Sequence, residues 1–135
     1  MSNEQTLSII KPDAVERNLS DKIKNIFLEN GLKIIDTKKI HISKDEASEF
    51  YKVHQSKPFY EDLCNYLSSS AIIVSILEGE NAVLAHRKIL GATNPKEAEK
   101  GTIRELFGIS IDKNSVHGSD SVENAKVEIG FFFKN

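Results

Sequence analysis

The sequence predicts an α/β (α+β) sandwich, in which a four-stranded antiparallel sheet has helices packed on it. Short stretches rich in Ile, Val and Leu alternate with longer stretches whose apolar residues recur at helical spacing. The chain has 135 residues, which is a common size for one domain. Apolar residues make up 39% and charged residues 28% of it, as in globular proteins. We therefore expect one domain, residues 1–135, with its own core.

The first half of the chain predicts two strands with a helix between them. Residues 6–10 (TLSII) form the first strand, which ends before Pro12 because proline lacks the N–H that a sheet ladder needs. Ser20 is suited to cap a helix and Gly31 to end it. Residues 32–42 (LKIIDTKKIHI) then predict the second strand.

The middle of the chain predicts further helices around a third strand. Residues 43–46 (SKDE) fit a capping box, which indicates a helix over 47–54. A second helix is predicted over 59–67. The strongest buried-strand pattern is 71–77 (AIIVSIL), and a helix over 81–91 follows it.

The last third of the chain is mostly irregular. Residues 92–120 show only a short helical pattern near 102–107 (TIRELF), whereas 127–133 (VEIGFFF) predicts the last strand. The core order βαββαβ is that of a ferredoxin-like motif, an antiparallel sheet with helices on one face. A long segment with little regular structure is often functional, so we expect a site in it.

Charge and composition exclude several classes of protein. The net charge of -2 argues against a general nucleic-acid-binding surface. No apolar run approaches the roughly 20 residues of a membrane span, and no signal peptide is expected. Cys64, the one cysteine, lies in an apolar helical pattern that predicts a core position, and a lone cysteine fits a reducing compartment. We therefore expect a cytoplasmic protein without membrane or nucleic-acid partners.

His117, in the segment NSVHGSDS, is the first candidate for chemistry. Gly118 and Ser119 follow it, and such small residues let an anion approach the ring. Imidazole is largely neutral near pH 7 and can then act as a nucleophile. The alternative is ordinary, because an isolated histidine is more often a surface or core residue.

Glu128 is the candidate partner of this histidine. On the expected last strand, its carboxylate would accept a hydrogen bond from one ring nitrogen and leave the other free to attack. Its alternation with Val127 and Ile129 fits a solvent-facing strand position even better.

Cationic residues provide candidates for phosphate binding. The chain has only three arginines, of which Arg87 lies in HRKILGATNP and Arg104 in GTIRELF. Guanidinium groups suit two-pronged phosphate contacts, and Lys11, at a strand end, suits a point-charge contact. Thr93 lies between these segments. Each cation alone is more often a solvated charge, and Thr93 fits a simple helix-ending turn.

Together these segments resemble the nucleoside diphosphate kinase family. The resemblance covers nearly the whole chain and rests on the blocks TLSIIKPDAV, KPFYEDL, HRKILGATNP, GTIRELFG, NSVHGSDS and EIGFFF, in this order. NSVHGSDS is the most specific of them. The chain ends at Asn135, without the C-terminal extension of eukaryotic members, which favours a bacterial-type enzyme.

The resemblance implies a ferredoxin-like fold and transfer of the γ-phosphoryl of a nucleoside triphosphate to a nucleoside diphosphate. The reaction is ping-pong, through a phosphohistidine on His117. Base and sugar specificity are broad, and the enzyme maintains nucleotide pools. Mg²⁺ arrives bound to the nucleotide phosphates, without protein metal ligands of its own. The assembly is a homotetramer or a homohexamer.

The resemblance also implies roles for individual residues. Glu128 and Ser119 hold the ring of His117, and Tyr51 lies beside the phosphoryl path. The residues implied in nucleotide binding are Lys11 and Asn114 at the sugar, Arg87, Thr93 and Arg104 at the phosphates, and Phe59 and Ile111 at the base. The chain departs from the family pattern at Glu105-Leu106, where a small residue and an acid are usual. The strand that ends at 75–77 also lacks the tryptophan often found there in the family.

Two other classes of function compete with the kinase. Ferredoxin-like domains also serve as RNA-binding or regulatory modules, but an RNA-binding sheet would carry stacking aromatics, and 71–77 has none. An inactive relative would be expected to lack His117 or an arginine of the phosphate site, and all of these are present. The sequence therefore favours the active kinase.

Overall fold

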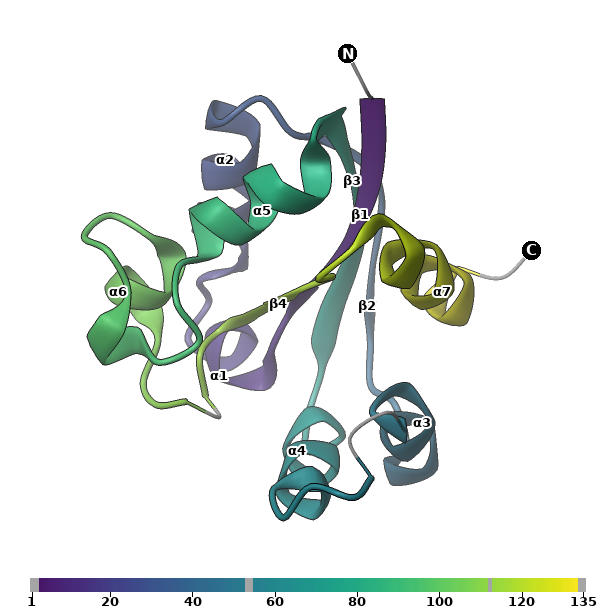
Figure 1. The fold of residues 1–135 in the computed structure, drawn as a ribbon. Coiled ribbons are helices and arrows are strands. Elements are labelled where there is room, and N and C mark those ends of the chain that lie inside the picture. The colour runs from purple at the N-terminus through teal and green to yellow at the C-terminus, as the bar shows by residue number, and fades with distance from the viewer. Residues whose placement is uncertain (1–2, 53–54, 112, 134–135) are drawn as a thin grey trace.

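The structure is a computed structural model that describes residues 3–52, 55–111 and 113–133. Its elements are, in chain order, β1 (Asn3–Ile10), α1 (Pro12–Glu16), α2 (Ser20–Glu29), β2 (Lys33–Ile40), α3 (Lys44–Phe50), α4 (Tyr60–Leu67), β3 (Ile72–Glu80), α5 (Ala82–Leu90), η2 (Pro95–Glu97), α6 (Ile103–Phe107), β4 (Val116–Gly118) and α7 (Val122–Phe132) (Figure 1). The end of the helix predicted over 47–54, at Val53 and His54, lies outside the described residues.

The strands form one sheet in the order β2-β3-β1-β4, with antiparallel pairing throughout. This confirms the predicted four-stranded antiparallel sheet. β1 is central, so that Ser8 lies opposite Ser75 of β3 on one side and Gly118 of β4 on the other. The pairing of β1 with β4 places the end of β1 beside His117.

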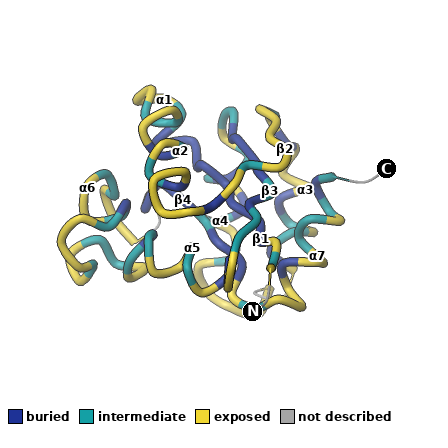
Figure 2. The backbone as a smooth tube through the Cα atoms, turned by 90° about the horizontal axis from the view of Figure 1, so that it is seen from above, coloured by how far each residue is buried: buried dark blue, intermediate teal, exposed yellow. Residues whose placement is uncertain are grey.

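Helices cover both faces of this sheet, so the expectation of helices on one face was wrong. One core contains Ile10 and Phe27 with residues of α5, and the other contains Leu7 and Ile9 with residues of α3, α4 and α7. Figure 2 shows β1 and β3 largely buried between these layers. The physical reason is visible in residues 71–77, because a strand that is apolar at successive positions must be buried on both faces.

The prediction of a last strand over 127–133 was also wrong. These residues belong to α7, and the fourth strand is the short β4, within the segment expected to be a loop. Ser121 begins the helix by accepting a hydrogen bond from the backbone N–H of Asn124. Ala125 and Phe132 are buried, and helical spacing puts them on one face.

Pro12 ends β1 as predicted and also begins α1, which was not predicted. Proline suits the first helical position because its missing N–H is not needed there. The backbone N–H of Lys11 donates to the carbonyl of Ser115 at 2.8 Å. Lys11 is thereby held next to the segment that leads into β4.

Candidate active site

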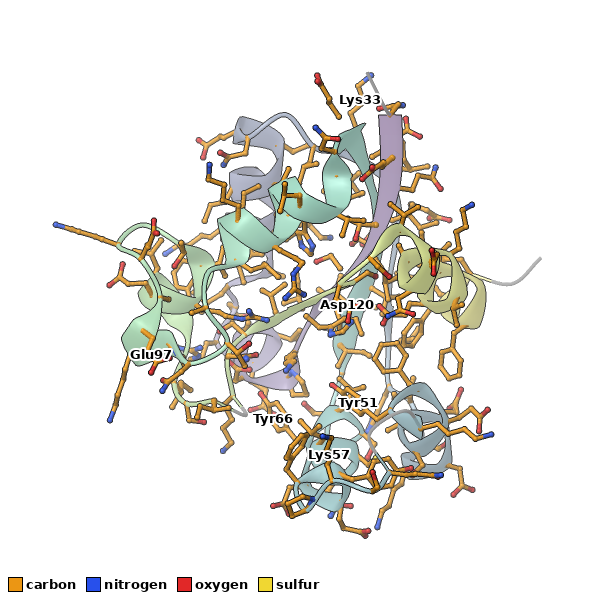
Figure 3. All side chains as sticks on the ribbon, viewed as in Figure 1. Lys33, Tyr51, Lys57, Tyr66, Glu97 and Asp120 are labelled. Atoms are coloured by element: carbon orange, nitrogen blue, oxygen red, sulfur yellow. The ribbon has the colours of Figure 1, made fainter. Side chains whose placement is uncertain are left out.

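A cavity of about 500 Å³ lies where β4, α7, α4 and the segment before β4 meet. Every predicted site residue except Ser119 lines it, namely Lys11, Tyr51, Phe59, Arg87, Thr93, Arg104, Ile111, Asn114, His117 and Glu128. Figure 3 labels two of the lining residues, Tyr51 near α3 and Asp120 near β4. Residues from distant parts of the sequence therefore converge on one cavity.

His117 is oriented by a carboxylate that is itself held in place. Its Nε2 lies 2.9 Å from Glu128 Oε1, and the same oxygen accepts a hydrogen bond from Ser119 Oγ at 2.7 Å. Ser119 is fully buried, whereas the side chains of His117 and Glu128 are 22% and 20% exposed. Because a carboxylate accepts, Nε2 carries the proton and Nδ1 of the neutral ring has a free lone pair.

β4 packs against the side chain of His86, which lies on α5. This ring is fully buried, packs edge-on against Phe27 at 5.0 Å between centroids, and has no hydrogen-bond partner among the described residues. A Cβ at Gly118 would lie 2.6 Å from His86 Nδ1. Burial lowers the pKa of His86 to about 3, with Arg104 and other cavity residues acting in the same direction. The ring is therefore neutral, and β4 needs a glycine to lie on it.

Two guanidinium groups make one end of the cavity electropositive. Arg104 of α6 donates to the carbonyls of Gly91 and Val116 at 2.9 and 2.8 Å, so its position is fixed. Burial lowers the pKa of Arg104 to about 10, and the charge of Arg87 adds to this effect. Arg104 therefore remains charged at neutral pH, and repulsion between the two guanidinium groups favours the binding of an anion.

Lys11 and Asn114 connect three parts of the cavity wall. Lys11 Nζ donates to Asn114 Oδ1 at 3.0 Å, and Asn114 Nδ2 donates to the Thr93 carbonyl at 3.1 Å. Lys11 and Asn114 are both buried, whereas Thr93 is exposed. The chain of bonds fixes the end of β1 against the loops on either side of α6.

The other end of the cavity is apolar. Phe59, at the start of α4, is 43% exposed, and Ile111, which also lines the cavity, is 56% exposed. Large apolar side chains that remain exposed at a cavity rim suit a flat aromatic ligand. Tyr51 is buried, and burial raises the pKa of its hydroxyl, which therefore stays protonated at neutral pH.

A second hollow, of about 590 Å³, lies between α3 and β2 and has the wrong charge for phosphate. Asp45, Glu46 and Glu49 line it, and their negative charges would repel an anion. Volume alone therefore does not identify the site, whereas the converging cations and the oriented histidine do.

Comparisons with known proteins agree with this geometry. The family model described as "Nucleoside diphosphate kinase" matches residues 4–135. The chain belongs to the nucleoside diphosphate kinase family. As a member it is an enzyme, a phosphotransferase. A nucleoside diphosphate kinase of Campylobacter jejuni is 58% identical over 97% of this chain and 96% of its own length. One from Rhizorhabdus wittichii is 53% identical over 99% and 96%.

Solved nucleoside diphosphate kinases share the fold closely. The enzyme of Aquifex aeolicus superposes with a TM-score of 0.96 at 39% identity, covering 99% of this chain and 97% of that one. The enzyme of Encephalitozoon cuniculi gives 0.95 at 36% identity, covering 98% and 90%. The family resemblance and the ferredoxin-like fold expected from the sequence are thus confirmed.

The kinase cavity also contains residues to which the sequence assigned no role in a site, namely Leu63, Asp120 and Asn124. Asn124 lies four residues before Glu128, and this spacing puts the two on one helix face. The capping pattern of Ser121 was the signal for that helix. Asp120 lies within NSVHGSDS but had no assigned role.

Two further features of the described residues concern metal ions and membranes. Among them, no group of three or more His, Cys, Asp or Glu side chains is placed to hold a metal ion. None of the helices in this part of the chain is both long and apolar enough to cross a membrane.

Proposed function

We propose that this kinase transfers the γ-phosphoryl group of a nucleoside triphosphate to a nucleoside diphosphate through a phosphohistidine at Nδ1 of His117. The observation that carries the proposal is the 2.9 Å contact between His117 Nε2 and Glu128 Oε1. With the proton held on Nε2, Nδ1 attacks phosphorus directly and needs no general base. The N–P bond forms as the bond to the β-phosphate oxygen breaks, the diphosphate leaves, and a second diphosphate reverses the step.

The charges of the cavity support this reaction. Phosphoryl transfer has a metaphosphate-like transition state and is accelerated mainly by positioning and positive charge. In our proposal Arg87, Arg104 and Thr93 bind the phosphates, Lys11 and Asn114 bind the sugar, and Tyr51 lies beside the phosphoryl path. Arg104 suits this role because its two carbonyl contacts fix it in advance.

Magnesium enters with the nucleotide in this proposal. Mg²⁺ keeps several waters and binds substrate phosphates with few carboxylates, so the nucleotide can bring it without a protein metal cluster. Asp120 supplies one carboxylate at the cavity wall. The metal would neutralise phosphate charge, while the cationic side chains orient the transferred group.

Base specificity is expected to be broad. Phe59 and Ile111 have no hydrogen-bonding group in their side chains, and stacking tolerates every base at roughly 1–3 kcal/mol each. Steady-state kcat/KM for common purine and pyrimidine diphosphates, with ribose or deoxyribose, should differ by about one to two orders of magnitude. A preference of about 10⁴-fold for one base, worth roughly 5.5 kcal/mol, would contradict this.

We propose that residues 1–135 act as one domain, in a cytoplasmic homotetramer or homohexamer that maintains nucleotide pools. The buried free thiol of Cys64 supports a reducing compartment. Sedimentation velocity of the purified protein distinguishes these two assemblies from a monomer.

The decisive experiment is to incubate the protein with γ-labelled ATP without acceptor. An acid-labile, alkali-stable phosphoprotein is expected, and added diphosphate should remove its label. His117→Ala should fold but take up no label. His41→Ala is the matched control, because His41 is exposed and lies outside the cavity. Labelling of His117→Ala at the parental rate would refute the assignment.

A further inference from the structure

Asp13 is a buried carboxylate that bonds to two of the segments forming the wall of the nucleotide cavity. It lies in the first turn of α1, two residues after Lys11, and its side chain is 4% exposed. Its carboxylate accepts hydrogen bonds from the Tyr66 hydroxyl, from Ser115 Oγ at 2.8 Å and from Arg17 at 3.0 Å. Its backbone N–H donates to the Tyr66 oxygen at 2.8 Å. Asp13 is not among the residues that line the cavity but lies at a separate hollow together with Arg17 and Tyr66.

The partners of Asp13 belong to two different segments of the cavity wall. Tyr66 is on α4, one helical turn after Leu63, and α4 begins beside Phe59; both Leu63 and Phe59 line the cavity. Figure 3 shows Tyr66 on the side of α4 that faces α1. Ser115 directly follows Asn114, in the segment that carries Ile111, and Asn114 and Ile111 also line the cavity. One carboxylate therefore joins the wall of Phe59 to the wall of Ile111.

Ser115 depends on this bridge for its conformation. Its φ is 74°, in the left-handed region that non-glycine residues seldom occupy. Its side chain bonds to Asp13, and its carbonyl accepts from the Lys11 backbone at 2.8 Å. Arg17 also donates a hydrogen bond of 2.6 Å to the carbonyl of Phe107, the last residue of α6. A strained residue persists only where its neighbours hold it, so the loss of the Asp13 contacts should let this wall move.

We infer that Asp13 is a positioning residue that sets the separation between the two walls that hold the nucleoside. The inference rests on the proposed nucleotide cavity but not on the identity of the nucleophile. Hydrogen bonds to a buried carboxylate are about twice as strong as neutral ones, so both walls are tied firmly to one point. Binding of the nucleoside part should depend on the bridge. Binding of the phosphates should depend on it much less, because among the described residues neither Arg87 nor Arg104 forms a hydrogen bond with Asp13, Tyr66 or Ser115.

Single-atom variants test the two arms of the bridge. The arm to α4 is the hydrogen bond that Tyr66 donates to Asp13, and Tyr66→Phe removes it. The arm to the wall of Ile111 is the hydrogen bond that Ser115 donates to Asp13, and Ser115→Ala removes it. Each should weaken ADP binding by about tenfold, the scale of one hydrogen bond to a charged group. Inhibition by inorganic tripolyphosphate, which has no nucleoside, should be nearly unchanged. The double variant should lose less than the product of the single losses, since both arms act on one separation.

Tyr60→Phe is the matched control. Tyr60 is on the same helix, and its hydroxyl donates to the Ser48 carbonyl of α3 at 2.9 Å, away from Asp13. This variant loses one tyrosine hydroxyl of α4 but should bind ADP like the parent. Asp13→Asn should weaken ADP binding more than either arm variant. The amide is neutral, and its NH₂ group would face the N–H donors of Arg17.

Two outcomes would overturn the inference. One is unchanged ADP binding in both arm variants, and the other is an equal loss of ADP and tripolyphosphate binding, which would indicate a general loss of structure. The proposed function fails by a different result, namely the absence of phosphohistidine in the unaltered enzyme. At saturating ATP, both arm variants should still label His117 to the full extent.

Discussion

At the scale of single residues, the site is organised before any nucleotide binds. His117 has one nitrogen committed to Glu128 and the other available, and Arg104 is held by two backbone carbonyls. Groups fixed in this way need little rearrangement when charge develops in the transition state. The variants that test this arrangement should therefore change rates more than stability.

Replacement of Glu128 by Gln should slow phosphoryl transfer by about ten- to a hundredfold, or roughly 1.4–2.7 kcal/mol. The neutral amide fills the same space but accepts a weaker hydrogen bond from the imidazole. A single-turnover measurement with ATP gives the rate, and titration with ADP gives the affinity, which should be nearly unchanged. Glu123→Gln, exposed on the same helix, is the control. Equal losses of rate and affinity would indicate a disturbed helix instead.

Arg87→Ala and Arg104→Ala should each lower kcat/KM by about 10²-fold or more, as expected for the loss of one preorganised transition-state donor. Lys88→Ala controls for the loss of charge next to Arg87, because Lys88 lies outside the cavity. If steady-state kcat/KM stays at the parental level in both arginine variants, the arginines are only solvated charges.

At the scale of elements, the sequence allowed most of the fold to be predicted but not the C-terminal part. Strands such as 71–77 are apolar at successive positions, and the capping box at Ser43 formed as expected. In VEIGFFF the apolar residues alternate at first and are then continuous, which fits a strand and a helix about equally well. Local pattern cannot choose between them, because the packing of Phe132 against distant residues decides.

The residues that line the cavity were predicted better than the elements that carry them. Residues such as His117 and Arg104 were found from motifs that do not depend on secondary structure. Glu128 was expected beside His117 on a strand, and it reaches the ring from α7 instead. The bridge at Asp13 left no signal, since contacts between residues as far apart as Asp13 and Ser115 arise only in the folded chain.

The support of β4 by α5 gives a prediction at this scale. Gly118→Ala would put a methyl group 2.6 Å from His86 Nδ1, and overpacking of this kind costs about 1–3 kcal/mol. Chemical denaturation should show this loss in the parent background. In a His86→Ala background the contact with the ring is gone and the close contact that remains is Leu90 Cδ1 at 2.9 Å. Because that atom is the end of a flexible side chain, Gly118→Ala should cost less there. Equal costs in both backgrounds would show that the two residues are not coupled.

At the scale of the whole molecule, the neutral His86 makes stability depend on pH. Its folded pKa of about 3 is well below the unfolded value near 6.5. The unfolded chain therefore binds a proton that the folded chain does not. The free energy of unfolding should therefore be unaffected by His86 above about pH 6.5. Below that pH it should fall by up to about 1.4 kcal/mol per pH unit.

Denaturation curves between pH 7 and pH 4 measure this effect against His86→Leu, which lacks the titrating group and should have the shallower slope. Phe27→Leu is the control, because it disturbs packing against the same ring but keeps the imidazole, and its loss should be constant with pH. Parallel slopes for the parent and His86→Leu would show that the buried ring gains no proton on unfolding.

The position of β4 also has a consequence for how the enzyme is made. β1 leaves the ribosome long before Val116–Gly118, so one of its edges stays open until that strand pairs with it. Such an edge is a template for wrong partners, and pairing across so much of the chain is intrinsically slow. Because Glu128 follows even later, a nascent chain that stops short of α7 has His117 without the carboxylate that contacts its ring. The cavity is therefore complete only after α7 has been made.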